Sequence, residues 1–284
     1  MSEPRSWLFV PADSERKIAK ALASEADAII LDLEDSVAPQ QKPAAREIVR
    51  SLNTAAAAPA LWVRVNPLTS EFHKDDLEVL ANPAIHGVVL PKAEAGTDVQ
   101  QLASRTGNVP IHAIVTETAA SLFGLMSYRL LGVPLAAMSW GAEDLSAALG
   151  ASSKYDSDGS LSFTYKMARS LCLAGAVAAG VQPVDGVFAD FRDPEGLRAE
   201  AEAAAREGFT GKLAIHPDQV AVINAAFSPG AEDIAHAEAI IAAFEAEPHA
   251  GVLSVGGRMV DRPHLLQARR VLERSRKEQF NGHD

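Results

Sequence analysis

Carboxylates and a lysine recur along the chain, each directly after a short apolar run. Glu34 and Asp35 follow one run, Lys92 follows another, and Glu117 and Asp144 follow two later ones. Carboxylates brought close together repel one another and raise each other's pKa unless a cation neutralises them. Oxygen ligands of this kind suit Mg²⁺ or Mn²⁺ better than zinc. The pattern therefore predicts a divalent metal site with Glu117 and Asp144 as its two protein ligands.

Arg64 stands inside the apolar segment LWVRVNP. At such a position a strand normally presents either a core aliphatic side chain or a functional group. Burying a guanidinium is unfavourable unless its charge is paired. We therefore expect Glu34 or Asp35 to hold Arg64, and we expect the guanidinium to face an anionic group of a substrate.

Each of these polar residues also has an ordinary structural role when it is taken alone. Asp32, Glu34 and Asp35 could form a helix cap and a solvated turn, and Glu143 could cap the helix that follows it. Lys92 could form a Schiff base, but a lysine paired with a carboxylate explains its position equally well. These residues form a functional site only if the fold brings them together in space.

The elements that would bring them together are eight short β-type runs, each followed by a helical or polar stretch. That alternation is typical of βα units around a parallel sheet, and eight units favour a closed barrel. In such a barrel the functional groups lie at the carboxyl ends of the strands. The predicted strands are Trp7–Val10, Ala28–Leu33, Leu61–Val65, Gly87–Leu90, Ile111–Val115, Ala136–Trp140, Asp185–Ala189 and Lys212–His216. The predicted fold class is an α/β (β/α)8 TIM barrel with a C-terminal helical extension.

The rest of the chain adds a loop and a tail to this barrel. Gly150–Leu161 is rich in Gly, Ser and Asp and is a candidate lid. Ala231–Glu247 and Arg262–Gln279 are predicted helices beyond the last strand. We therefore expect a catalytic barrel domain over residues 1–230 and an extension over residues 231–284.

Composition limits the classes of function. The chain has 284 residues, 48% of them hydrophobic, and a formal net charge of −11. Nucleic-acid binding is not expected, because such proteins rely on Lys and Arg facing the phosphates. The N-terminus lacks the apolar core of a secretory signal, and no run reaches the roughly 18 apolar residues of a membrane span. The single cysteine, Cys172, suits a cytoplasmic protein, and we expect it to be a packed helix residue.

Eight motifs along nearly the whole chain resemble the HpcH/HpaI aldolase and citrate-lyase beta-subunit-like (CitE-like) family. They occur in the order found in that family. The motifs are RSWLFVP, DAIILDLEDSV, WVRVNP, GVVLPKAE, TETAAS, GAEDLSAALG, GFTGKLAIHPDQV and GGRMVDRPHLLQARR.

The resemblance implies a Claisen or retro-Claisen enzyme that acts on malyl-CoA-like or citramalyl-CoA-like thioesters and releases a small α-keto acid. It implies Mg²⁺, with Mn²⁺ as an alternative, on Glu117 and Asp144. It gives Arg64 the role of steadying the keto-acid or thioester oxygen, supported by Glu34 and Asp35. It makes Asp261 an acid/base supplied by a neighbouring subunit, in a homotrimer or homohexamer.

Other functions stay open at this point. The same residues would serve a metal-dependent aldolase on free hydroxy-keto acids or a thioesterase that hydrolyses the same CoA ester. A noncatalytic subunit of a citrate-lyase-like complex is a further alternative, against which the presence of Asp261 argues. Asp261 in turn could simply cap the helix that begins at Arg262.

Overall fold

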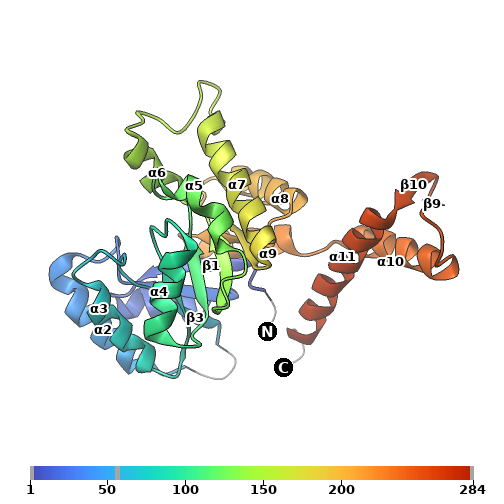
Figure 1. Cartoon of the computed structure of the whole chain (residues 1–284). Helices are drawn as coiled ribbons and strands as arrows, with labels where there is room; N and C mark the ends of the chain where they lie inside the picture. The colour runs from blue at the N-terminus through green and yellow to red at the C-terminus, as the bar shows by residue number, and fades with distance from the viewer. Residues whose placement is uncertain (1–2, 55–57, 282–284) are drawn as a thin grey trace. The chain divides into compact units, whose positions relative to one another are not determined.

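The computed structural model describes residues 3–54 and 58–281, and its main feature is a closed barrel of eight parallel strands (Figure 1). Each strand pairs with the next in the sequence, and β1 pairs with β8 to close the barrel. The strands are β1 (Ser6–Pro11), β2 (Ala28–Asp32), β3 (Ala60–Arg64), β4 (Ile85–Leu90), β5 (Ile111–Ile114), β6 (Leu135–Ser139), β7 (Gln182–Asp185) and β8 (Gly211–Ala214). The expected (β/α)8 TIM barrel is confirmed.

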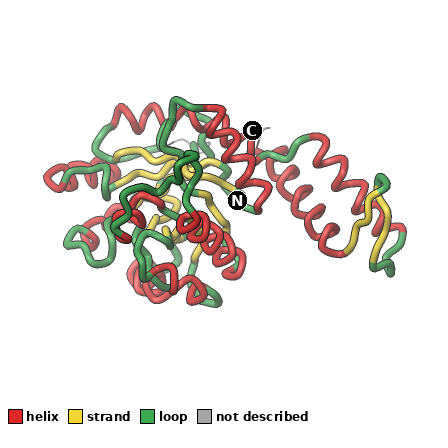
Figure 2. The backbone as a smooth tube through the Cα atoms, turned by 90° about the horizontal axis from the view of Figure 1, so that it is seen from above, coloured by secondary structure: helices red, strands yellow, loops and turns green. Residues whose placement is uncertain are grey.

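Helices and short 3-10 segments connect the strands and surround them, as the view from above shows (Figure 2). None of the described helices is long and apolar enough to cross a membrane. The connecting elements are α1 (Glu15–Leu22), η1 (Pro39–Gln41), α2 (Lys42–Ser51), α3 (His73–Asp76), η2 (Leu77–Ala81), α4 (Gly96–Thr106), α5 (Ser121–Gly124), η3 (Leu125–Tyr128), α6 (Ala142–Leu149), α7 (Phe163–Ala179), α8 (Pro194–Glu207), η4 (Pro217–Gln219) and α9 (Val220–Phe227).

The barrel strands are apolar on both faces because one face fills the barrel and the other lies under the helices. Every residue of β2 and of β5 is buried. Each fully buried Ile or Leu side chain stabilises the fold by about 1.5–3 kcal/mol relative to an exposed one. All eight strands contribute to one core cluster, which consists of Trp7, Ala28, Ile30, Trp62, Val89, Ile114, Ala137, Val184 and Leu213.

The seventh strand does not lie where it was predicted. The expected run was Asp185–Ala189, but β7 is Gln182–Asp185, so the two share only Asp185. Pro183 lies inside the true strand, where its missing N–H makes the sequence look like a loop. Val187 lies beyond the strand, yet it still packs against the barrel core, and its apolar character therefore imitates a strand residue. The eighth strand also ends early, at Ala214.

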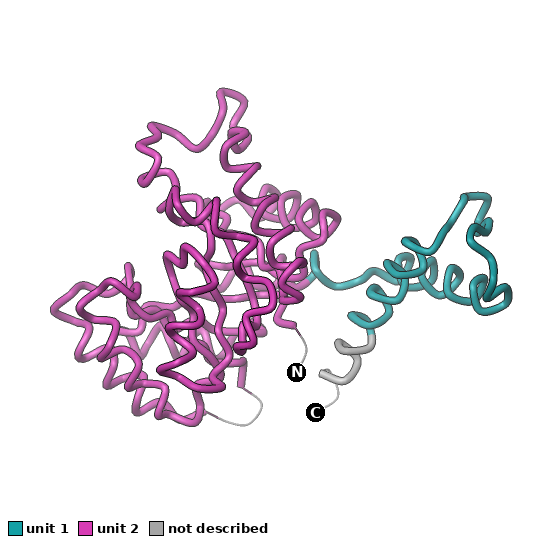
Figure 3. Tube along the Cα trace, viewed as in Figure 1, with its two compact units in different colours: residues 1–2, 225–284 teal, residues 3–224 magenta. Residues whose placement is uncertain are grey.

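The chain divides into two compact units, one formed by residues 3–224 and the other containing residues 225–281 (Figure 3). The sequence analysis placed the corresponding boundary between residues 230 and 231. The second unit contains α10 (Ala231–Ala246), β9 (Val252–Val255), β10 (Arg258–Asp261) and α11 (Arg262–Asn281). Both predicted helices of the tail are therefore present.

The second unit has a small core of its own. Strands β9 and β10 form an antiparallel hairpin whose two turn residues, Gly256 and Gly257, both have positive φ, a conformation that glycine adopts without strain. The two helices pack against this hairpin. The core consists of Ala237, Ile240, Phe244, Val260, Leu265 and Ala268.

A histidine lies fully buried inside the barrel, toward the amino ends of the strands. His112 Nε2 lies 2.8 Å from Ser139 Oγ, and its ring packs edge-on against Trp7 with the centroids 4.6 Å apart. Nδ1 has no hydrogen-bond partner among the described residues. Burial lowers the pKa of His112 from its usual 6.5 to about 3, so the folded protein holds this ring neutral.

His112 should make the fold sensitive to acid. The unfolded chain takes up a proton on this histidine below about pH 6.5, whereas the folded protein does so only near pH 3, so stability falls as the pH drops between these values. The free energy of unfolding should lose up to about 1.4 kcal/mol per pH unit from this one group. Denaturant unfolding at pH 7, 6, 5 and 4 measures the slope. His112→Gln should give a shallower slope, and equal slopes would contradict the assignment.

Candidate active site

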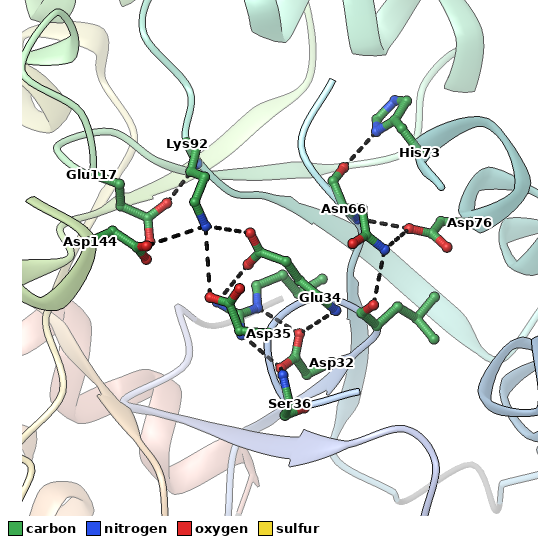
Figure 4. A network of polar contacts seen from close by, with 12 residues as sticks. Asp32, Glu34, Asp35, Ser36, Asn66, His73, Asp76, Lys92, Glu117 and Asp144 are labelled. Carbon is green, nitrogen blue, oxygen red and sulfur yellow. Dashed lines mark hydrogen bonds and ion pairs between the residues drawn. The ribbon is translucent and has the colours of Figure 1, made fainter. Parts of the chain in front are cut away.

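The polar side chains singled out in the sequence lie at the carboxyl ends of neighbouring barrel strands. Figure 4 shows the carboxylates converging on Lys92. Arg64 is the last residue of β3, and Asp144 is in the first turn of α6, directly after β6. The others follow their strands: Glu34 and Asp35 follow β2, Lys92 follows β4, and Glu117 follows β5. The barrel thus brings together residues that are up to 110 positions apart (34 to 144).

Asp32 is the main partner of Arg64, and the sequence analysis did not assign it that role. Arg64 Nε and Nη2 each donate to one Asp32 carboxylate oxygen at 2.7 Å. The register of β2 and β3 places Asp32 directly opposite Arg64, which is the signal that could have identified the pair. Of the two expected partners, Glu34 contacts Arg64 Nη1 at 2.9 Å, whereas the largely exposed Asp35 stays 3.9 Å away.

These contacts fix the charge state of the pair. Burial alone would lower the pKa of Arg64, but the neighbouring Asp32 carboxylate more than compensates and raises it above its usual range. Burial alone would likewise raise the pKa of Asp32, and Arg64 keeps it low. The ring of Phe9 lies beneath the guanidinium, 4.8 Å from its carbon. A guanidinium carries five N–H donors, so this arrangement leaves donors for an anionic substrate group.

Lys92 connects the arginine side of the site with the other carboxylates. Its Nζ donates to Glu34 Oε1 at 2.5 Å and lies 3.5 Å from Asp144 Oδ1 and 3.7 Å from Asp35 Oδ2. Burial opposes the charged form, but Glu34 outweighs it and raises the pKa of Lys92 above its usual range. The side chain is therefore an ammonium, which lacks the lone pair that a Schiff-base nucleophile needs. Of the two roles considered for Lys92, it therefore has the second, a lysine paired with carboxylates.

Glu117 occupies a buried position that suits a metal ligand. Its Oε2 accepts the backbone N–H of Lys92 at 2.6 Å, and burial raises the pKa of Glu117 to about 8. A Cβ atom on Gly141 would lie 2.9 Å from Glu117 Cγ and 3.0 Å from Oε1, so glycine at this position makes room for the carboxylate. A nearby divalent cation would stabilise the ionised form that this dry environment disfavours.

Asp144 completes a pair of hard oxygen donors. Figure 4 shows its carboxylate beside that of Glu117. In the part of the chain that the structure describes, no group of three or more His, Cys, Asp or Glu side chains is arranged to hold a metal. Two neighbouring carboxylates fit Mg²⁺, which usually keeps several waters and binds few protein groups. Glu117, Asp144 and the space provided by Gly141 therefore fit a catalytic magnesium ion.

A second layer of buried polar groups holds the turn that carries Glu34. Lys42 Nζ donates to the main-chain carbonyls of Leu33 and Glu34, at 2.7 and 2.8 Å, and to Asn66 Oδ1 at 3.0 Å. This layer was not among the features predicted from the sequence. The sequence feature that corresponds to this layer is the pair of cations Lys42 and Arg46, one turn apart on α2. The structure shows that both are buried.

Asp261 lies in the second compact unit, as the last residue of β10. Its Oδ1 lies 2.5 Å from Nδ1 of His264 and accepts the backbone N–H of His264 at 3.4 Å. This is the contact of a residue that caps α11, which begins at Arg262. The hydrogen bond from His264 lowers the pKa of Asp261.

Cys172 has the packed structural role expected for it, and His216 also has a structural role. Cys172 is fully buried in α7, and burial raises the pKa of its thiol. The ring of His216 stacks on Phe191 with the centroids 4.7 Å apart, and its Nδ1 accepts the backbone N–H of Asp218. The candidate lid between α6 and α7 carries an isolated bridge from Tyr155 to Leu161.

Sequence profiles of known families match almost the whole chain. Residues 5–217 match the family described as HpcH/HpaI aldolase/citrate lyase, and residues 160–277 match the family described as C–C bond lyase of the TIM-barrel fold. The chain belongs to the HpcH/HpaI aldolase/citrate lyase family. As a member of this family it is a carbon–carbon lyase, and the resemblance seen in its motifs is confirmed.

Relatives with assigned names cover nearly all of the chain. A (3S)-malyl-CoA thioesterase of Cereibacter sphaeroides is 39% identical over 95% of this chain and 94% of its own length. The human mitochondrial citramalyl-CoA lyase is 35% identical over 94% of this chain and 84% of its own length. The crystal structure of CitE from Mycobacterium tuberculosis with magnesium, acetoacetate and coenzyme A is 39% identical, covers 95% of this chain and 97% of that one, and superposes with a TM-score of 0.83. The magnesium in that relative agrees with the metal expected here.

The contacts of Arg64 lead to a test of its role in this family's chemistry. Lysine keeps the charge but lacks the planar fork through which Arg64 binds both Asp32 oxygens with two nitrogens and keeps a fixed orientation. Arg64→Lys should therefore reduce the turnover of the lyase reaction by about 10²-fold, as expected when a donor to a developing oxyanion is lost. Steady-state kinetics on a variant with an unchanged melting temperature measures the effect. Wild-type kcat in Arg64→Lys would exclude the role.

Proposed function

We propose that the protein is a magnesium-dependent CoA ester lyase that cleaves or forms a carbon–carbon bond in a β-hydroxyacyl-CoA. Citramalyl-CoA and malyl-CoA are the substrates we favour, giving acetyl-CoA or another acyl-CoA together with pyruvate or glyoxylate. The observation that carries the proposal is that Glu117 and Asp144 meet at Lys92, which Glu34 joins to the paired Arg64, at one end of the barrel. Mg²⁺ is the proposed metal, and Mn²⁺ is an alternative. The names and the ligands of the relatives support this choice.

The chemistry follows from where charge moves. When bound, magnesium would supply a Lewis acid toward the carboxylate and carbonyl oxygens of the keto acid. In the cleavage direction the substrate hydroxyl gives its proton to the Asp261 carboxylate and becomes that carbonyl, while the electron pair of the broken bond moves onto the acyl-CoA fragment as an enolate. The remaining donors of Arg64 stabilise the enolate oxygen. A carboxylic acid then protonates the enolate carbon, and we assign this step to Asp261.

Glu34 and Asp35 have supporting roles in this scheme. Glu34 pairs with Arg64 through one oxygen and with Lys92 through the other, so it orients both cations. Asp35 is more exposed and lies 3.7 Å from Lys92 Nζ. We assign these two carboxylates to holding the cations and ordering water near the metal, without direct participation in bond cleavage.

Hydrolysis of the thioester is the second candidate function. It is favoured by one observation, the 39% identity to a protein named as a (3S)-malyl-CoA thioesterase. Hydrolysis would break the bond between sulfur and the acyl carbon and would leave the carbon skeleton intact. The two reactions therefore differ in their products, which are an acyl-CoA for the lyase and free CoA thiol for the thioesterase.

A product assay on the purified protein tests the proposal. We expect Mg²⁺-dependent release of acetyl-CoA and a keto acid from malyl-CoA or one citramalyl-CoA enantiomer. Chelation should abolish it, added Mg²⁺ should restore it, and Glu117→Gln combined with Asp144→Asn should reduce turnover to background. Chromatography that separates acyl-CoA from free CoA, coupled to a keto-acid assay, makes the measurement. Release of free CoA without keto acid would favour the thioesterase, and full activity of the double variant in metal-free buffer would refute the metal site.

We further propose that the extension, residues 231–284 in the sequence analysis, brings Asp261 to the site of a neighbouring subunit in a homotrimer or homohexamer. Both compact units expose large apolar side chains, a feature that is typical of surfaces covered by another chain. On the barrel unit these include Phe123, Leu130 and Phe163, and on the second unit they include Val252, Met259 and Leu266. The cap that Asp261 forms on α11 places its carboxylate at a helix start without burying it.

Mixing of inactive subunits tests this sharing of residues. Asp261→Ala and Glu117→Ala should each be nearly inactive alone, because each lacks one part of every site. Co-refolded mixtures should regain activity, since random assembly combines an intact metal site with an intact Asp261 in about one quarter of the sites. Native mass spectrometry verifies that mixed oligomers form. Mixed oligomers without recovered activity would argue against sharing, and a fully active Asp261→Ala would remove the catalytic role.

A further inference from the structure

Lys92 contacts both candidate metal ligands, and it uses two different groups to do so. Its backbone N–H donates to Glu117 Oε2 at 2.6 Å, and its Nζ lies 3.5 Å from Asp144 Oδ1. The same ammonium donates to Glu34 Oε1 at 2.5 Å and lies 3.7 Å from Asp35. Figure 4 shows it surrounded by these carboxylates. The ammonium therefore lies among the charges that a divalent cation would otherwise have to neutralise.

The backbone of Lys92 is in an unusual conformation. Of the non-glycine residues that the structure describes, only Lys92 and Leu130 have positive φ, and that of Lys92 is 52°. A side chain in this left-handed region costs about 1–2 kcal/mol, a cost that glycine would avoid. The conformation directs the N–H toward Glu117 and leaves the side chain to reach Glu34. The presence of lysine at a position where glycine would adopt the backbone conformation without strain indicates that the ammonium group has a function.

We propose that Lys92 is a positioning residue that acts as an internal counter-cation, holding the carboxylates of the metal-free site together and giving up Asp144 when the divalent metal arrives. This inference rests on the metal site of the proposed function. Without a positive charge among them, Glu34, Asp35 and Asp144 would repel one another across the rim, by which we mean the carboxyl ends of the barrel strands and the residues that follow them. Lys92 Nζ lies 3.5 Å from Asp144 Oδ1 and makes no hydrogen bond to it, whereas it donates to Glu34 Oε1 at 2.5 Å. Lys92 can therefore release Asp144 while it stays bound to Glu34.

The positive charge of Lys92 should affect metal binding in a way that a purely structural role would not. A lysine that neutralises the site also opposes the metal, so removing its charge should strengthen metal binding. A residue that merely shaped the ligands would do the opposite, because its loss would disorder the ligands and weaken metal binding. The direction of the change in metal affinity thus separates the two roles without any measurement of catalysis.

The experiment is a titration of the full-length, metal-free protein with Mn²⁺, followed by electron paramagnetic resonance in the absence of substrate. The key variant is Lys92→Asn, because asparagine tolerates positive φ and carries no charge. We expect Lys92→Asn to bind Mn²⁺ about ten-fold more tightly, since a unit charge a few Å from the metal is removed. Lys92→Arg should restore the wild-type affinity. Lys17→Asn, which removes an exposed lysine on α1, is the matched control and should leave the affinity unchanged.

A melting curve of the same proteins provides the second readout. Lys92→Asn should melt at a lower temperature than wild type in metal-free buffer, and saturating Mg²⁺ should raise its melting temperature by more than it raises that of wild type. If Lys92→Asn does not fold without metal, Lys92→Gly takes its place in the titration, because glycine preserves the backbone conformation. Equal or weaker Mn²⁺ binding by the charge-free variant would overturn the proposal.

Two carboxylate variants keep this inference separate from the proposed function. Glu117→Gln and Asp144→Asn should each reduce Mn²⁺ binding strongly in the same titration. If the wild-type protein binds no Mn²⁺, the metal site itself is wrong. If the wild type binds Mn²⁺ through these two carboxylates and removal of the Lys92 charge does not tighten binding, only the role of Lys92 is wrong.

Discussion

The contact between Asp32 and Arg64 is the interaction on which the rest of the site depends. A guanidinium at the end of a packed barrel is unfavourable unless a carboxylate matches its charge. Asp32 does so through both oxygens at 2.7 Å, from the position directly opposite on the neighbouring strand. The same carboxylate accepts the backbone N–H groups of Glu34 and Ser36. One aspartate therefore fixes both the arginine and the turn that presents Glu34.

Glu34 then joins two cations of different character. Arg64 is planar, tied at several atoms and always charged, so it suits a place where negative charge develops at a defined position. Lys92 carries a compact charge on a flexible stem, and its contacts range from 2.5 Å with Glu34 to 3.7 Å with Asp35. The rim thus combines a fixed cation on β3 with an adaptable one after β4. This difference explains why lysine would not replace arginine at position 64.

The sequence was sufficient to predict the barrel and most of the residues at its rim, because both depend on local patterns. Apolar runs indicate strands, and ionisable residues directly after them indicate the functional end. Pairing across strands is not local: Asp32 and Arg64 are 32 positions apart and face each other only through the register of β2 and β3. The predicted bounds of β7 were wrong for a related reason, because Val187 packs against the core although it lies beyond the end of the strand.

Stability and chemistry occupy opposite ends of this barrel. Toward the amino ends, Trp7, Trp62 and His112 pack edge-to-face inside the barrel, and the neutral imidazole is part of that apolar packing. At the carboxyl ends, Glu117 is held in a buried environment that disfavours its charge. A carboxylate in such a place lowers the stability of the metal-free protein, because its ionised form is poorly solvated. The aromatic packing toward the amino ends can therefore stabilise the fold while the carboxyl ends keep closely spaced charges available to a cation.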